Sequence, residues 1–410
     1  MTATLKKISV DQVRVGMYLH ALEGAWIDHP FWKNQFVIGD AADLRKLRDS
    51  KIREVWIDAG KGLDTGEPMA APVLTPARAA VPSAPVASVS PRPAPAATHS
   101  LNDELHAAAA ICNRGKKAVA LMFREARMGK AVDAESCLPL VQEISSSVYR
   151  NPGALVSLAR LKTQDEYTYM HSLAVCALMV ALGRQTGMDE AECRAAGLAG
   201  LMHDLGKVMM PIDVLNKPGK LTDEEFDVIR THPVRGHALL LEGRGAGPET
   251  LDVCLHHHER MDGTGYPHKL AGDAISRVAR MGAICDVYDA ITSNRPYKNG
   301  WDPAESVARM ASWRGHFDPA LFTHFVKSLG IYPVGSLVRL QSGRLAVVVE
   351  QNASALTAPA VKIFFSTKSN MPIPVQRLEL AASSDCIVGR ESVAHWGFKN
   401  LDALWSDDAR

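Results

Sequence analysis

Apolar and polar positions alternate in short runs over the first 67 residues of the chain. The segments "QVRVGMYL", "QFVIG" and "EVWID" are typical of strands, because successive side chains of a half-buried strand point to opposite faces. A further stretch, "AADLRKLRDS", has the spacing of an amphipathic helix. The pattern therefore predicts a small α+β module over residues 1–67.

This pattern stops over residues 68–100. From Pro68 to Pro95 the chain consists almost entirely of proline, alanine, valine and serine. Large side chains are too few there to form a packed core, and prolines are too frequent for a helix or a strand. We therefore expect a disordered linker over residues 68–100.

Helical periodicity begins after the linker. The segments "NDELHAAAAICNRGKKAVALMFREAR", "AESCLPLVQEISSSVYR" and "DEYTYMHSLAVCALMVALGRQ" carry apolar residues three and four positions apart, and few strand signals precede residue 333. Further on, "SLVRLQSGRLAVVVE" alternates around Ser342 and Gly343, and "AVKIFF" follows. The predicted fold is mainly α, with a helical region over 101–332 and a small β-rich appendage and tail over 333–410.

Composition narrows the class of protein. The 410 residues are 47% hydrophobic and 22% charged, which is typical of a globular chain, and a net charge of +1 argues against a protein that coats a nucleic acid polymer. No apolar stretch approaches the length of a membrane span, and the first residues do not resemble a secretory signal. Seven cysteines without a C-x-x-C spacing fit reduced thiols, so we expect a cytoplasmic protein.

Histidines gather in one part of the helical region, since eight of the fifteen lie between residues 171 and 268. His171 has Val175 and Leu178 four and seven positions later, so it should point inward from its helix. His203 and Asp204 precede Gly206, a helix-stop residue, and should lie where the chain turns. His232 follows a helix that begins with a capping box from Thr222 to Glu225.

Two further features add ligand-type side chains. Three consecutive histidines precede Glu259, and adjacent helical residues point about 100° apart, so the three cannot all share one face. Asp286 lies among apolar residues, where an unpaired carboxylate would be costly. Each residue alone is also compatible with a satisfied core position, but together five imidazoles and two carboxylates match a pair of first-row divalent metals, with Asp204 as a bridge.

The order H…HD…HPxxGH…HHExxDGxGYP…D, with the flanks "HDLGK", "LNKPGKLTDEE" and "DAITSNRPYK", resembles the HD-GYP domain, a branch of the HD metal-dependent phosphohydrolases. The resemblance covers residues 150–330 and implies an all-helical HD-type domain. The first module is similar to a poorly understood domain often placed ahead of HD-GYP domains. The metal ligands that the resemblance implies are His171, His203, Asp204, His232, His257, His258 and Asp286. It also implies that Lys207 acts beside the metals, and that the substrate is contacted by Gly263, Gly265, Tyr266, Pro267, Arg295 and Lys298.

The activity implied by the resemblance is hydrolysis of cyclic di-GMP to linear pGpG, and in some members onward to GMP. Two divalent ions, iron or manganese, would lower the pKa of a bound water from 15.7 toward about 7 and so supply hydroxide at neutral pH. Some members place a glutamate four residues before the first histidine to hold a third metal; that position is Tyr167 here, so we expect two.

Two alternatives from other classes stay open. The domain could be a receptor or adaptor that binds cyclic di-GMP, or GGDEF-type diguanylate cyclases through the GYP loop, with weak catalysis. It could also be an enzyme for another cyclic dinucleotide or for a nucleotide monophosphate. A complete set of ligand-type residues favours catalysis over the first alternative, and the additional histidines and the GYP loop argue against a simple nucleotidase.

Overall fold

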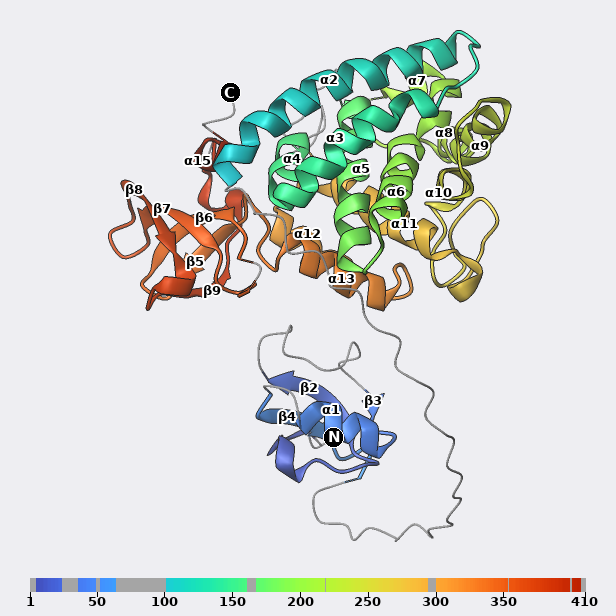
Figure 1. Cartoon of the computed structure of the whole chain (residues 1–410). Helices are drawn as coiled ribbons and strands as arrows, with labels where there is room; N and C mark the ends of the chain where they lie inside the picture. Colours follow the sequence, from blue (N-terminus) through green and yellow to red (C-terminus); the bar gives the residue numbers. More distant parts are fainter. Residues whose placement is uncertain are drawn as a thin grey trace, which may run out of the picture. The chain divides into compact units, whose positions relative to one another are not determined.

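A computed structural model of the chain describes residues 5–23, 36–48, 52–63, 101–160, 167–217, 219–293, 300–352, 354–398 and 400–406. The chain divides into two compact units, Met1–Arg92 and Pro93–Arg410 (Figure 1). The expected linker, residues 68–100, lies outside the described residues.

In its described residues, the first unit is a four-stranded antiparallel sheet with one α-helix. Its strands lie in the order β1-β4-β2-β3, and its core includes Leu19 of β2, Leu47 of α1 and Ile57 of β4. The elements are β1 (Leu5–Ser9), β2 (Tyr18–Glu23), β3 (Phe36–Val37), α1 (Ala41–Arg48) and β4 (Glu54–Asp58). The α+β character agrees with the prediction, but the strand predicted at residue 12 begins only at Tyr18, because Ser9 and Gln12 form a capping box that starts a short 3-10 helix instead.

The second unit is a helical domain with a sheet at one end (Figure 1). Side-chain caps begin several of its helices: Asp189 and Glu192 form a capping box, and Asp302 and Asp318 each cap a helix that starts with proline. The longer helices are α2 (Leu101–Arg127), α3 (Leu138–Arg150), α4 (Pro152–Arg160), α5 (Tyr167–Gln185), α6 (Glu190–Met202), α9 (His232–Glu242), α10 (Pro248–His256), α11 (Arg277–Thr292), α12 (Pro303–Ser312) and α13 (Pro319–Leu329). The shorter ones are η3 (Glu135–Cys137), η5 (Leu205–Met209), α7 (Ile212–Leu215), α8 (Asp223–Ile229) and η6 (Gly272–Ala274).

The C-terminal sheet is antiparallel, in the order β8-β7-β6-β5-β9. Adjacent residues of its strands face opposite sides, so that Leu337 and Val347 join the core of the helices while Val338 and Val348 join a smaller core on the other face. The elements are β5 (Leu337–Leu340), β6 (Arg344–Glu350), β7 (Ala360–Ser366), β8 (Met371–Glu379), η7 (Leu380–Ala382), β9 (Ile387–Arg390), α14 (Val393–Trp396) and α15 (Ala403–Ser406). The mainly α fold with β-rich ends is thus as predicted.

Among the residues that the structure describes, no helix is long and apolar enough to cross a membrane.

Candidate metal centre

Five helices bring the seven expected ligand residues into two adjoining clusters. Within each cluster, one potential ligand atom from each residue lies within 4.8 Å of the others. One cluster contains Asp204, His232, His257 and His258, and the other contains His171, His203 and Asp286. All are buried except His258, whose side chain is 23% exposed, so His258 lies on the solvent side of the centre.

The His203–Asp204 pair lies at the end of α6, as expected, but for a different reason. Gly206 does not have the positive φ of a left-handed helix cap. Instead, a Cβ at Gly206 would lie 1.9 Å from the carbonyl oxygen of His232, so this glycine lets the backbone of η5 pack directly against α9. Close approach of these two elements brings His232 to Asp204.

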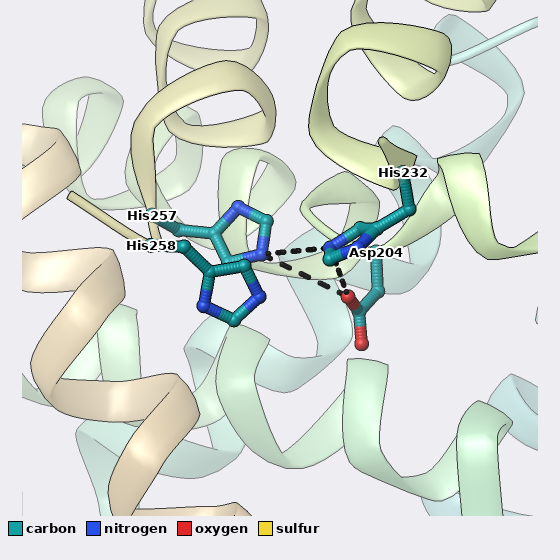
Figure 2. A group of neighbouring side chains, drawn as sticks. All are labelled: Asp204, His232, His257 and His258. Carbon is teal, nitrogen blue, oxygen red and sulfur yellow. Dashed lines mark hydrogen bonds and ion pairs between the residues drawn. The ribbon is translucent and has the colours of Figure 1, made fainter. Parts of the chain in front are cut away.

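Asp204 lies between the two clusters and presents one oxygen to each. Its Oδ1 lies 3.2 Å from His232 Nε2 and 3.8 Å from His257 Nε2, as Figure 2 shows. Its Oδ2 lies 3.4 Å from the Nε2 atoms of both His171 and His203. Lys207 also donates to Oδ2. The carboxylate therefore has the arrangement needed to bridge two cations.

Backbone carbonyls fix the orientation of three of the imidazole rings. Nδ1 of His203 is 2.8 Å from Gly200 O, and Nδ1 of His232 is 2.8 Å from Ile229 O. Nδ1 of His257 is likewise 2.9 Å from Val253 O. Because a neutral ring that donates from Nδ1 keeps its lone pair on Nε2, these bonds direct the metal-binding nitrogens into the centre.

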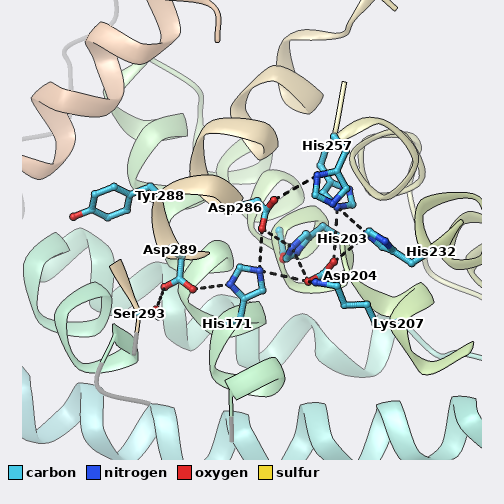
Figure 3. Close-up of polar contacts among 12 residues, drawn as sticks. His171, His203, Asp204, Lys207, His232, His257, Asp286, Tyr288, Asp289 and Ser293 are labelled. Carbon is cyan, nitrogen blue, oxygen red and sulfur yellow. Dashed lines mark hydrogen bonds and ion pairs between the residues drawn. The ribbon is translucent and has the colours of Figure 1, made fainter. Parts of the chain in front are cut away.

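His171 is oriented by a carboxylate instead. Its Nδ1 lies 2.6 Å from Asp289 Oδ2, and its Nε2 lies 3.0 Å from Asp286 Oδ1 (Figure 3). Asp289 was not assigned this positioning role from the sequence. The available signal was its place three residues after Asp286 on one apolar helix, which puts the two carboxylates on the same face.

Without metal, the carboxylates of Asp204 and Asp286 favour protonation of the imidazole rings beside them. Burial opposes a charge on His203, but Asp204 and Asp286 outweigh it and raise its pKa to about 10. The pKa of His171 is also raised, by Asp204, Asp286 and Asp289 against the effect of burial. Burial lowers the pKa of His258 to about 3 and that of His257 well below its ordinary value, which leaves these two rings neutral.

The donor set fits divalent metal ions. His203 Nε2 and Asp204 Oδ1 are buried and make no well-aligned hydrogen bond among the described residues, although each faces an oppositely charged or polar group at 3.2–3.4 Å. Buried polar atoms of this kind are costly unless they bind a partner. Imidazole nitrogens and carboxylate oxygens converging on one place are the ligands that first-row divalent metals prefer.

Of the three consecutive histidines, His256 is set apart from the other two. It is the last residue of α10, and its ring contacts Asp252 Oδ1 at 2.7 Å and His268 Nδ1 at 3.0 Å. His257 and His258 follow in the turn and enter the first cluster. The change in direction at the helix end separates these neighbours.

The loop with the sequence "DGTGYP" packs against the backbone of the turn that follows α10. A Cβ at Gly265 would lie 2.6 Å from the carbonyl oxygen of His258, so only glycine permits this approach. The ring of Tyr266 then stacks on His258 with centroids 4.7 Å apart. The buried carboxylate of Glu259 accepts from the amides of His268 (2.7 Å) and Leu270 (3.1 Å). Gly263 and Pro267 belong to the same loop, whereas Arg295 and Lys298 lie outside the described residues.

Comparisons with known proteins match both parts of the chain. The HD domain family matches residues 150–321, and a domain of unknown function, DUF3391, matches residues 5–137. A cyclic di-GMP phosphodiesterase of Pseudomonas aeruginosa is 55% identical over 410 residues, which cover 99% of this chain and 97% of that protein.

Less similar relatives match a smaller share of the chain. A cyclic di-GMP phosphodiesterase response regulator of Xanthomonas campestris is 39% identical over 171 residues, covering 40% of this chain and 45% of that protein. A 3′3′-cGAMP-specific phosphodiesterase of Vibrio cholerae is 34% identical over 167 residues, which cover 40% of this chain and 38% of that protein. With the match to the Pseudomonas enzyme over nearly its whole length, the chain belongs to the HD-GYP family of HD-domain phosphodiesterases.

Proposed function

We propose that this chain hydrolyses cyclic di-GMP to linear pGpG at the centre around Asp204. The observation that carries the proposal is the placement of the two Asp204 oxygens, one toward each cluster of ligand-type residues. Relatives whose names specify cyclic di-GMP phosphodiesterases support this choice of substrate, and one of them matches the chain over nearly its whole length.

We further propose that the centre holds two metal ions, iron or manganese. The residues that would hold them are His171, His203, Asp204, His232, His257, His258 and Asp286. When bound, such ions supply a nucleophile at neutral pH and neutralise charge on the phosphate. Three nearby carboxylates have other partners: Asp289 contacts His171, Glu259 accepts from the amide of His268, and Asp262 accepts from the amide of Thr264. This supports two ions rather than three.

The residues of the chain itself supply orientation and charge. Hydrolysis adds one water to the ring: the hydroxyl joins phosphorus, the bond to the 3′ oxygen breaks, and that oxygen takes the proton. Lys207, which is 27% exposed and contacts Asp204, is in place to stabilise negative charge on the phosphate. Gly263, Gly265, Tyr266 and Pro267 of the GYP loop are proposed to contact the substrate, as are Arg295 and Lys298.

Cleavage of pGpG to GMP would be a second reaction at this centre. Docking of a diguanylate cyclase on the GYP loop would serve regulation and leave the ligand set unchanged. All seven cysteines are free, which supports a reducing compartment and therefore a cytoplasmic location.

The test is cyclic di-GMP turnover by protein purified without oxygen, with pGpG and GMP separated and metals measured by elemental analysis. Wild-type protein should contain about two metals per chain and form pGpG. Asp204→Ala and His257→Ala should each lose metal and activity, because each removes a proposed ligand.

His256→Ala is the matched control, since it removes an adjacent histidine that has other partners, and it should retain its metal. Full turnover by a folded Asp204→Ala protein would refute the proposed centre. Loss of metal in His256→Ala but not in His257→Ala would show that the ligand assignment is wrong.

A further inference from the structure

Arg230 lies between two aromatic rings beside the metal centre. Its guanidinium carbon is 5.1 Å from the ring centroid of Tyr266 and 5.7 Å from that of Phe226. Both distances are within the range of cation–π attraction. The residue directly follows α8 and precedes His232 by two positions, so its backbone lies next to a proposed metal ligand.

Tyr266 connects this arginine to the centre. Its ring stacks on that of His258, with an interplanar angle of 28°. Burial raises the pKa of Tyr266, and the charges of Asp286 and Asp204 raise it further, so the phenol lies in the electrostatic field of the centre. Arg230 is therefore separated from a proposed metal ligand by a single aromatic ring.

Both Arg230 and Phe226 are accessible to a ligand. The Arg230 side chain is 36% exposed and Phe226 is 46% exposed. Among the described residues, the polar contact of the Arg230 guanidinium is a 3.4 Å pair with Asp227, whose side chain is 73% exposed. An exposed pair of this kind contributes little stability. Most of the five guanidinium donors thus stay open to a ligand.

The side chains of Arg230 and Phe226 together are better suited to bind a purine base than a phosphate. An exposed ring offers a surface on which a base can stack. A planar guanidinium beside it can donate two hydrogen bonds to the O6 and N7 acceptors of guanine, whereas adenine presents one acceptor and one donor on the same edge. Lys207, next to Asp204, already provides a cation for the phosphate that is cleaved.

We propose that Arg230 recognises a guanine of the cyclic dinucleotide, with Phe226 as the surface on which the base stacks. This inference rests on the proposed function and assigns a residue to base selectivity. Selectivity differs among the relatives, since some are named for cyclic di-GMP and others for 3′3′-cGAMP.

The test compares Arg230→Gln with Arg235→Gln, which removes the same charge from an exposed position on α9. Equilibrium affinities for hydrolysis-resistant phosphorothioate analogues of cyclic di-GMP and cyclic di-AMP are measured together with kcat/KM and metal content. Arg230→Gln should lower the affinity for the guanine ligand about 10-fold and that for the adenine ligand little, because glutamine pairs with adenine. Phe226→Leu should weaken both ligands alike, because stacking does not depend on the base.

Arg235→Gln should bind both ligands as wild type does, and metal content should be the same in all these variants. Equal losses for both ligands in Arg230→Gln would overturn the inference and indicate a phosphate contact instead. An unchanged affinity for cyclic di-GMP in Arg230→Gln would overturn it as well. Failure of the proposed function is distinct, because wild-type protein would then neither bind nor hydrolyse cyclic di-GMP.

Discussion

At the scale of single residues, the geometry of the centre depends on groups one contact away from the ligands. Asp289 is buried and holds His171 by its Nδ1, and the Ser293 hydroxyl lies 3.3 Å from the other Asp289 oxygen. A carboxylate in this position fixes the tautomer and direction of the ring and increases its basicity.

Asp289→Ala should therefore weaken metal binding or activity about 10- to 100-fold while the chain stays folded. Ser293→Ala is the control, because it removes only the more distant hydroxyl and should have a much smaller effect. The measurements are metal titration and circular dichroism. Wild-type metal affinity in a folded Asp289→Ala protein would contradict the positioning role.

Metal binding should also release protons. In the metal-free protein the pKa of His203 is raised to about 10 and that of His171 is raised too, so His203 carries a proton at pH 7 that a metal must displace. Metal affinity should thus fall as the pH falls, by about tenfold per pH unit for each displaced proton.

Calorimetric titration in buffers of different ionisation enthalpy measures this release directly. His203→Ala should release fewer protons than the wild type. Metal binding that is independent of pH between 6 and 9 would show that these rings are neutral before the metal arrives.

Residue types could be predicted from the sequence better than their partners. The histidine spacing and the motif identified seven residues that the fold brings together, because ligand chemistry depends on residue type. The role of Asp289 could not be predicted in the same way, since it depends on a contact between residues 118 positions apart. His256 and His257 likewise have the same chemistry and are separated only by where α10 ends.

At the scale of elements, three of the proposed ligands lie where helices begin or end, whereas His171 and Asp286 lie within α5 and α11. His203 follows the last residue of α6, His232 begins α9, and His257 follows α10. The capping box at Thr222, which begins the helix before His232, was as expected. Which backbones would touch could not be predicted, and Gly206 was for this reason misinterpreted as a helix stop.

Gly206→Ala tests this contact between elements. Its Cβ would overlap the His232 carbonyl, so η5 and α9 would have to separate. We expect a loss of about 1–3 kcal/mol in the free energy of unfolding, as for other overpacked sites, together with weaker metal binding.

The control is Gly389→Ala, where a Cβ would meet nothing within 4 Å and no positive φ is required. This variant should be as stable as the wild type and bind metal normally. Thermal unfolding and elemental analysis provide the comparison. Gly206→Ala with wild-type stability and metal content would show that η5 and α9 are not in tight contact.

Strands were predicted where alternation was regular and missed where it was not. The apolar segments that became β6 and β7 were expected to be strands, and both strands form. β8 contains two prolines and is exposed along most of its length, so neither its composition nor an apolar face indicated a strand. It forms through pairing with β7, which is a contact between segments rather than a local preference.

At the scale of the whole molecule, the proposed chemistry belongs to one unit. All seven ligand-type residues, the GYP loop and Arg230 lie in Pro93–Arg410. The C-terminal sheet shares the core of that unit, because Leu337 and Val347 belong to the same apolar cluster as the helices, and Trp405 of α15 joins that cluster. We therefore propose that the β-rich end is needed for a stable helical domain, whereas the first 67 residues are not.

The last prediction follows from this division. Residues 70–95 carry prolines and small side chains that cannot build a core, and every residue of the proposed centre lies beyond them. Deleting residues 70–95 should leave the thermal unfolding of the helical unit unchanged, and it should still bind about two metals per chain. A chain that ends at residue 332 is the comparison variant, and the opposite result is expected for it. It lacks Leu337, Val347 and Trp405 of the shared core, so it should be strongly destabilised. Both variants are compared with the full chain by calorimetry and elemental analysis. Aggregation of the linker deletion while the full chain remains in solution would show that residues 70–95 contribute to folding, and a stable chain ending at 332 would show that the sheet is a separate module.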